Sequence, residues 1–376
     1  MSRTGLSFIL LLTLFALGSL AGCGREAKEP PLLRIGHAPT DHHASLFIAA
    51  MNPEYFRKHD GIWLKEKIWR SEYELLDQDR VLARVVIDAS TGGQELVRRL
   101  AEEQQDMVTG GVPAMLNFID QGSAIRIVAP LMADGAALVG RPALPADNWQ
   151  GFVALARTAE PPLRIGYKIG LSVQHLILEQ ALQAAGLSFS HDIADSTVDV
   201  ILVNLFGEKN LLPALENALV DGVVTNQPFP AMAEVRGVGK IVALLHELPP
   251  AGKWRSTPCC ALAASERYIS EQPEVAGAMV ALLREANRFL KNNPDKSAVQ
   301  IARWLEIDPE MERRSLPTIT WVEEFDADWQ RGVAFWVEAM IAGDLLHGKV
   351  KEAAIGGRVP ELIYDRSLGG RGPQGR

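Results

Sequence analysis

Three adjacent residues near the start of the chain, Asp41, His42 and His43, carry groups that could bind a small molecule. They stand directly before an apolar-periodic stretch, 44–51, that predicts a helix. An imidazole can donate a hydrogen bond to an oxyanion or stack on a ring, whereas Asp41 could equally cap the helix. Aspartate and histidine are also metal ligands, but the sequence has no second cluster spaced to complete such a site. We therefore expect ligand binding here and no metal.

Two glycine-containing segments follow strand-like runs in the same part of the chain. They are Ser90-Thr91-Gly92-Gly93 and Thr109-Gly110-Gly111-Val112, and each precedes an expected helix. Hydroxyl groups and bare backbone N–H groups at a helix start can hold an anion or a carbonyl. The first segment lacks the length and the Lys-Ser/Thr ending of a P-loop. Either could equally be a plain strand-to-helix turn. The candidate ligand-binding residues are Thr91, Gly92, Gly111 and Val112.

The second half of the chain carries a comparable set of polar residues after strand-like runs. Ser172 is placed to cap a helix and His175 follows it, while Asn204 ends the apolar run 200–203. The amide of Gln227 is uncharged, so it could hydrogen-bond an anion without repelling it. The ligand-binding candidates here are Ser172, His175, Asn204, Asn226 and Gln227.

Cys259 and Cys260 are adjacent within a strand-like run, 258–263. Neighbouring residues in a strand point to opposite faces, and a disulfide between them would be strained. We therefore expect two reduced, half-buried thiols.

Two internal repeats indicate how these segments are positioned. The segment 30–37 resembles 161–167, and each is a short strand-like run followed by a polar loop and an apolar-periodic helix, 44–51 or 173–185. Likewise 106–115 and 125–129 resemble 221–232 and 240–243. Strands alternating with helices predict parallel sheets. Because the pattern occurs twice in the same order, we expect two α/β lobes with a cleft between their strand ends.

The composition limits the class of protein. The chain has 376 residues, 47% of them apolar, which is enough for two packed units and excludes wholesale disorder. Its 38 basic and 46 acidic residues give a net charge of −8, so nucleic acid is not an expected partner. Three cysteines are too few for a disulfide scaffold.

The first residues predict export. Arg3 precedes the apolar run 8–17, which is too short to span a bilayer but has the length of a signal-peptide core. The following Leu20-Ala21-Gly22-Cys23 resembles the lipobox of bacterial lipoproteins. We expect a signal peptide, 1–22, lipidation of Cys23, and a tether, 23–31. An ordinary secretory cleavage site beside an incidental cysteine is the alternative, and either leaves open which membrane is involved.

Three further patterns resemble the substrate-binding proteins of ABC importers in the nitrate/sulfonate/taurine group, which includes relatives of thiamine-precursor binders. They are 34–44, 110–114 before the turn 120–122, and 257–264 followed by 273–275. The resemblance implies an α/β, two-lobed periplasmic-binding-protein fold of type II with two crossover strands, 136–140 and 258–263. It implies a first lobe of 32–135 and 258–368, with the last sixty residues packed on it. The second lobe would be 136–257, and a disordered tail, 369–376, would follow.

The resemblance further implies capture of a small solute by hinge closure and its delivery to an ABC permease. The solute would be a nitrate-, sulfonate- or taurine-type anion or a related small organic molecule, bound by a monomer without a cofactor. One alternative is an enzyme on the same fold, as in pyrimidine synthesis or the menaquinone pathway. We expect no enzymatic activity, because Asp41 with His42 is the sole candidate for a nucleophile–base pair. A membrane-tethered sensor domain is the other alternative, which the sequence alone does not separate from a transport role.

Overall fold

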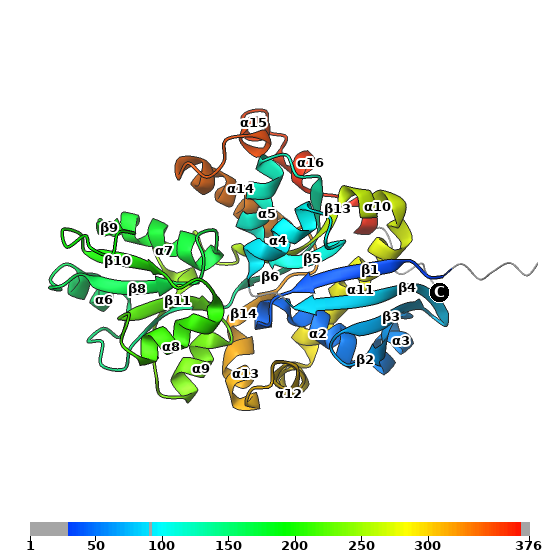
Figure 1. Ribbon diagram of the computed structural model, residues 1–376, viewed down its shortest axis with the longest axis horizontal. Coiled ribbons are helices and arrows are strands. Elements are labelled where there is room, and N and C mark those ends of the chain that lie inside the picture. The colour runs from blue at the N-terminus through cyan, green and yellow to red at the C-terminus, as the bar shows by residue number, and fades with distance from the viewer. Residues whose placement is uncertain (1–28, 90–91, 370–376) are drawn as a thin grey trace, which may run out of the picture. The chain divides into compact units, whose positions relative to one another are not determined.

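The computed structural model describes residues 29–89 and 92–369, and the part from Pro31 onward is one compact unit whose strands form two β-sheets (Figure 1). The predicted signal peptide, most of the tether, Cys23 and Thr91 lie outside the described residues, as does the predicted tail beyond residue 369. Within the described ranges, no helix has both the length and the apolar character needed to cross a membrane.

The first sheet has eight strands in the order β14-β6-β13-β5-β1-β4-β3-β2. The strand β1 pairs in parallel with β4 and β5, and β13 runs antiparallel between β5 and β6. The members of this sheet are β1 (Leu32–His37), β2 (Ile62–Ile68), β3 (Glu72–Asp77), β4 (Arg80–Ala89), β5 (Met107–Gly111), β6 (Ile125–Asp134), β13 (Pro258–Ser265) and β14 (Ile319–Trp321).

The second sheet has six strands in the order β12-β7-β11-β8-β10-β9. The strand β8 pairs in parallel with β10 and β11, and β7 is antiparallel to β11 and β12. The strands are β7 (Ala136–Gly140), β8 (Leu163–Tyr167), β9 (Phe189–Ser190), β10 (Val200–Asn204), β11 (Gly222–Asn226) and β12 (Lys240–Leu244). The repeated strand–helix pattern predicted two α/β units with parallel sheets. The structure has two sheets, but both are mixed, because β13 and β7 run antiparallel to their neighbours.

The chain crosses between the sheets twice. β6 ends at Asp134 in the first sheet and β7 begins at Ala136 in the second, while the return runs from Leu244 to Pro258. Gly135, at the first crossing, has a φ of +69°, and a Cβ atom there would lie 2.7 Å from Cγ1 of Ile319. A larger residue would be strained and would clash, so this crossing requires glycine.

Helices cover the sheets, and several of them begin at a proline, whose fixed φ and missing N–H suit the first helical position. The helices are α2 (Ala44–Met51), α3 (Pro53–His59), α4 (Gly93–Ala101), α5 (Val112–Asp120), α6 (Trp149–Ala156), α7 (Val173–Ala184), α8 (Leu211–Glu216), α9 (Phe229–Val235), α10 (Glu266–Glu271), α11 (Pro273–Asn292), α12 (Pro294–Leu305), α13 (Pro309–Ser315), α14 (Ala327–Ala342), α15 (Lys349–Ile355) and α16 (Val359–Ile363). Single 3₁₀ turns are η2 (Asp41–His43), η3 (Glu208–Asn210), η4 (Leu245–Glu247), η5 (Leu316–Thr318) and η6 (Ser367–Gly369).

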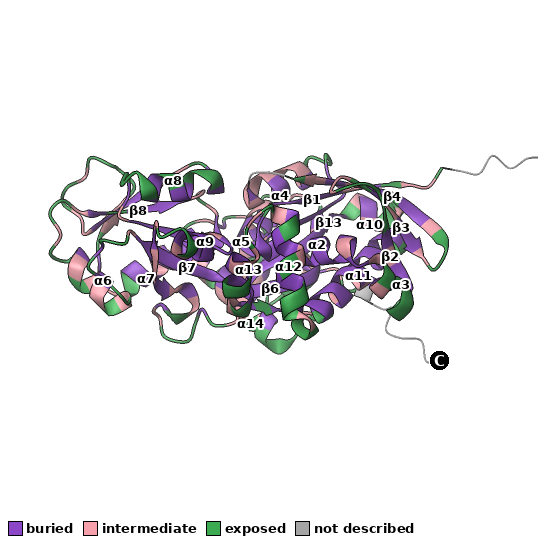
Figure 2. Ribbon diagram, turned by 90° about the horizontal axis from the view of Figure 1, so that it is seen from below, coloured by how far each residue is buried: buried purple, intermediate pink, exposed green. Residues whose placement is uncertain are grey.

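The C-terminal helices pack on the first sheet and its helices. α14 and α15 contact α5, and α16 contacts β6. The indole N–H of Trp336, on α14, donates to the carbonyl oxygen of Pro258 at 2.8 Å. Figure 2 shows the central strands buried and the helices exposed on their outer faces. α2 is an exception, because it is buried from Ala44 to Ala50. Such burial fixes the loop between β1 and α2, where the first candidate residues lie.

Candidate functional site

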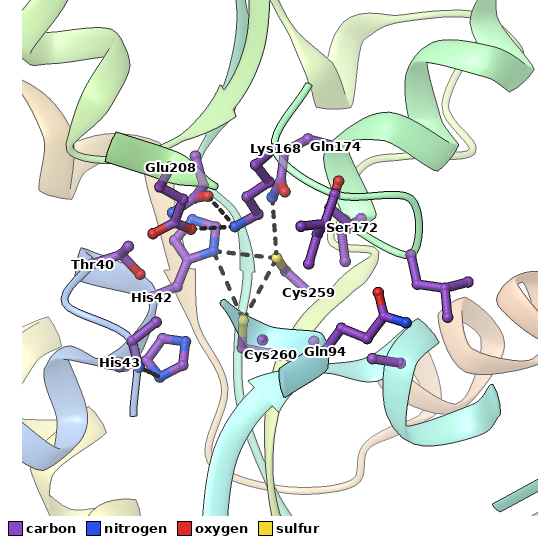
Figure 3. A pocket seen from close by; sticks show the side chains of 18 residues that line it. Thr40, His42, His43, Gln94, Lys168, Ser172, Gln174, Glu208, Cys259 and Cys260 are labelled. Atoms are coloured by element: carbon purple, nitrogen blue, oxygen red, sulfur yellow. Dashed lines mark hydrogen bonds and ion pairs between the residues drawn. The ribbon is translucent and has the colours of Figure 1, made fainter. Parts of the chain in front are cut away.

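A small pocket is lined by residues from both sheets (Figure 3). The first sheet contributes the loop after β1, the start of α4, the end of β5 and the start of β13; the second contributes the loop after β8, η3 and the end of β11. Open α/β sheets bind ligands beyond the carboxyl ends of their strands. The polar residues lining the pocket are Thr40, His42, His43, Gln94, Lys168, Ser172, Gln174, Glu208, Asn226, Cys259 and Cys260.

His42 connects the first crossover to the thiols of β13. Its Nε2 lies 2.9 Å from the carbonyl oxygen of Gly135, which can only accept, so Nε2 carries a hydrogen and donates. In the neutral ring Nδ1 then has a free lone pair. That atom lies 3.2 Å from Sγ of Cys259 and 3.9 Å from Sγ of Cys260. The imidazole is thereby held in the orientation that directs a basic nitrogen at the thiols.

His43 is oriented by the backbone of its own loop. Its Nδ1 accepts a hydrogen bond from the N–H of Ala38 at 3.2 Å and also contacts the hydroxyl of Thr109. A neutral ring that accepts at Nδ1 carries its hydrogen on Nε2. His43 lines the pocket, and its side chain also hydrogen-bonds Cys260, so Nε2–H is directed at that sulfur.

The two cysteines face the same pocket, so the prediction that they point to opposite faces is wrong. Their Sγ atoms lie 3.8 Å apart, and both residues are buried and free. The register between β13 and β6 shifts on either side of Cys260, so the strand is bulged there. A bulge places two consecutive residues against one and re-aims their side chains. The two thiols are free, as predicted, but they are buried and not half-buried.

The thiols are electrostatically inequivalent. The hydrogen bond between the two sulfur atoms, together with contacts from the His42 and His43 rings, holds the pKa of Cys260 well below its ordinary value despite the burial. The same bond to Cys260, together with burial, raises the pKa of Cys259. A thiolate beside an imidazole can act as a nucleophile or bind a soft metal ion. His42, Cys259 and Cys260 hold their ligand atoms within 4.8 Å of one another, a cluster that sequence spacing did not reveal.

A buried ion pair lies on the side of the second sheet. Nζ of Lys168 pairs with the carboxylate of Glu208 and donates to Oδ1 of Asn226 at 2.8 Å. The side chains of Lys168 and Glu208 are only 12% and 7% exposed. No sequence pattern pointed to either residue as a ligand contact. Lys168 directly follows the repeated strand 163–167, and that position was the available signal.

Five of the predicted ligand-binding residues line the pocket together. They come from both sheets, as the repeats required. Ser172 also accepts a hydrogen bond from the N–H of His175 at 3.4 Å and so caps α7, as predicted. These five residues are His42, His43, Gly111, Ser172 and Asn226.

The other described candidates lie away from this pocket. Asp41 is buried on the opposite side of η2, where it accepts a hydrogen bond from the hydroxyl of Ser315. The side chain of Gln227 donates to Oγ1 of Thr318 at 3.2 Å, and Asn204 accepts from the N–H of Phe206 at 2.9 Å. Three candidates complete the set: Gly92 in a neighbouring hollow, Val112 buried in the first turn of α5, and His175 directed toward Glu179. A ligand contact for these residues stays a prediction.

Comparison with known proteins identifies the family. Residues 26–306 match the NMT1-like family. The chain belongs to the NMT1-like family. It is also 34% identical over 125 residues to an uncharacterized protein of Methanocaldococcus jannaschii, a match that covers 33% of this chain and 86% of that protein.

Solved structures share the fold at low sequence identity. A zinc-bound ligand-binding component of an ABC-type import system from Staphylococcus aureus matches with a TM-score of 0.68 and 14% identity, covering 92% of this chain and 100% of that one. The nitrate-binding protein NrtA of Synechocystis PCC 6803 gives 0.66 and 14%, covering 90% and 87%. The alkanesulfonate-binding protein SsuA of Xanthomonas axonopodis pv. citri, bound to MOPS, gives 0.64 and 16%, covering 90% and 99%. The predicted family and two-lobed periplasmic-binding-protein fold are confirmed.

Proposed function

We propose that this chain is the solute-binding component of an ABC importer, exported and lipid-anchored through Cys23, which captures a small solute and presents it to a permease. The observation that carries the proposal is one pocket lined by strand ends of two separate sheets. A solute that contacts both sheets binds the closed arrangement more tightly than an open one, so it shifts the population toward closure. The two crossovers are the segments about which the lobes would hinge.

The pocket favours a small polar solute with an anionic group. Lys168 Nζ and the Ser172 hydroxyl are donors on the side of the second sheet, and Thr40 and Gln94 add a hydroxyl and an amide on the side of the first. Glu208 faces Lys168, so the pocket presents both signs of charge and suits a zwitterion such as taurine as well as a simple sulfonate or nitrate. The relatives named for nitrate and alkanesulfonate binding support this class.

A thermal-unfolding panel on residues 31–376 tests the proposal. The panel contains nitrate, bicarbonate, taurine, alkanesulfonates, thiamine precursors and pyrimidines. A ligand present at about 1,000 times its dissociation constant stabilises the native state by about 4 kcal/mol, and we expect one class to raise the midpoint by several degrees. The absence of any shift, together with mass spectrometry that finds no co-purified solute, would refute the proposal.

Lys168→Gln is expected to weaken binding of the panel's best anion or zwitterion at least about 10-fold, because it removes a desolvated charge from the pocket. Since this change leaves Glu208 buried without its partner, the double variant Lys168→Gln/Glu208→Gln is measured beside it by calorimetry. Lys240→Gln is the matched control, because Lys240 forms an exposed ion pair with Asp147. Equal affinity in the wild type and both Lys168 variants would remove this residue from the site.

One observation favours a second candidate, a thiophilic metal ion as the transported solute. His42, Cys259 and Cys260 are buried, line the pocket and offer one nitrogen and two sulfur ligands, which suit Zn²⁺ or Cu⁺. The variant Cys259→Ser/Cys260→Ser separates the candidates. It would abolish a rise in the melting midpoint induced by Cu⁺, a soft ion that thiolates select, and leave a sulfonate-induced rise in place.

A further inference from the structure

A second group of metal-ligating side chains lies on the second sheet's side of the molecule, outside the pocket described above. Nε2 of His175 and Nε2 of His191 lie 3.2 Å and 3.0 Å from the same carboxylate oxygen, Oε1 of Glu179. The three ligand atoms lie within 4.8 Å of one another. We propose that His175, Glu179 and His191 form a binding site for a divalent transition-metal ion of the Zn²⁺ type. This inference does not depend on the proposed function.

The local structure fixes both imidazoles with Nε2 directed inward. Nδ1 of His175 lies 2.8 Å from the carbonyl oxygen of Gly170, to which it must donate. The ring of Tyr167 stacks on that of His175 with centroids 3.8 Å apart, and its hydroxyl lies 3.2 Å from Nδ1 of His191. Hydrogen bonds that occupy one ring nitrogen and so orient the other are the usual support for a metal-ligating histidine.

When both imidazole rings are neutral, neither carries a positive charge to offset the carboxylate of Glu179. With a hydrogen on Nδ1, neutral His175 presents the lone pair of Nε2 to the carboxylate of Glu179, and two acceptors then face each other at 3.2 Å. That Nε2 is buried and makes no hydrogen bond among the described residues. Either a second proton on the ring or a cation between the three groups resolves the conflict. His191 has no such conflict, because a neutral ring can donate from Nε2 to Oε1 of Glu179 at 3.0 Å while Nδ1 accepts from Tyr167. A cation would replace that hydrogen bond and give the Nε2 lone pair of His175 a partner.

The donor set selects the type of ion. Two imidazole nitrogens and one carboxylate oxygen match a zinc site with three protein ligands, whereas Ca²⁺ and Mg²⁺ prefer oxygen ligands alone. His175 and Glu179 are four residues apart on α7, so they share one face of the helix. His191 is half exposed, and the cluster lines a hollow that α14 borders with Trp336 and Met340. That hollow provides an entry path and room for a fourth ligand.

Calorimetric titration of the metal-stripped chain with Zn²⁺ tests the site. We expect the Cys259→Ser/Cys260→Ser variant, which lacks the thiol cluster, to retain one Zn²⁺ site. His191→Gln in that background should weaken this site at least about 10-fold, because one of its three protein ligands is lost. Glu179→Gln should weaken it as well. His246→Gln is the matched control, since His246 lies outside the cluster.

The absorption of bound Co²⁺ gives a second readout. In the variant without the thiol pair, Co²⁺ should show a tetrahedral visible spectrum with no thiolate charge-transfer band, and His191→Gln should remove that spectrum. Circular dichroism checks that each variant is folded. If the variant lacking the thiols binds no Zn²⁺, or if His191→Gln and Glu179→Gln leave its affinity unchanged, the proposal is overturned.

Discussion

Asp120→Ala is expected to lower the free energy of unfolding by about 3–5 kcal/mol, because this carboxylate accepts four backbone hydrogen bonds in a buried position. Oδ2 accepts from the N–H groups of His347 and Gly348 at 2.7 Å and 2.8 Å. Oδ1 accepts from Val350 and Lys351 at 2.9 Å and 3.1 Å. The alanine variant leaves these donors at the start of α15 without their acceptor, and the C-terminal helices lose their anchor on α5.

Urea denaturation, with the midpoint and slope fitted for each variant, measures the effect. Asp120→Asn keeps one accepting oxygen but turns an amide NH₂ toward backbone donors, so its loss should be intermediate. Asp147→Ala is the control, because Asp147 is 84% exposed and changes there should stay within about 0.5 kcal/mol. A loss below about 1 kcal/mol in Asp120→Ala would mean that water replaces the carboxylate.

The sequence predicted the sheets and the loops at their strand ends because those features are local. Strands, glycine turns and helix starts recur over a few residues, and the repeat placed His42 and Ser172 at corresponding positions of two lobes. The partners of Asp120 were not predictable in this way. The residue reads as part of a surface turn, yet its hydrogen-bond partners lie more than 220 residues later.

Only part of the site could be predicted, because several of its contacts also join residues that are far apart in the sequence. Cys259 and His42 are 217 residues apart, and their contact depends on a bulge in β13 that strand periodicity does not encode. Lys168 and Glu208 lie in two different loops, and each alone resembles an ordinary charged surface residue. Asp41 has a neighbour that its sequence context did not indicate. The position before a helix predicted a helix cap or a ligand contact, whereas the structure places Asp41 beside the carboxyl group of Glu312 on α13.

The buried carboxyl groups of Asp41 and Glu312 give the second large prediction. Both side chains are essentially inaccessible to solvent. Burial, followed by the charge of Asp41, raises the pKa of Glu312 from 4.5 to about 11. Burial likewise raises the pKa of Asp41 from 3.8 to about 6, although the hydrogen bond from Ser315 opposes the shift. At neutral pH the folded protein therefore keeps a proton on Glu312 that the unfolded chain releases.

A raised carboxyl pKa stabilises the fold fully only below the unfolded-state value, here 4.5, and that stability is lost as the pH rises toward the folded value. The contribution of Glu312 to the free energy of unfolding should fall by up to about 1.4 kcal/mol per pH unit, or about 3 kcal/mol between pH 6.5 and 8.5. Because the lowered pKa of Cys260 acts in the opposite direction over this window, the contribution of Glu312 is measured as the difference between the wild type and Glu312→Gln. This window begins at the ordinary pKa of 6.5 of His37, whose own pKa burial lowers to about 4. The titration of His37, which increases stability as the pH rises, therefore opposes the fall only at the start of the window.

Glu312→Gln removes the titrating group while keeping its size, so the pH dependence from this pair should disappear. The variant should equal or exceed the wild type in stability at pH 8.5 and gain less at pH 6.5, measured by urea denaturation at both pH values. Glu310→Gln, on the same helix and half exposed, should leave the wild-type slope unchanged. A Glu312→Gln slope identical to that of the wild type would show that Glu312 ionises in the fold.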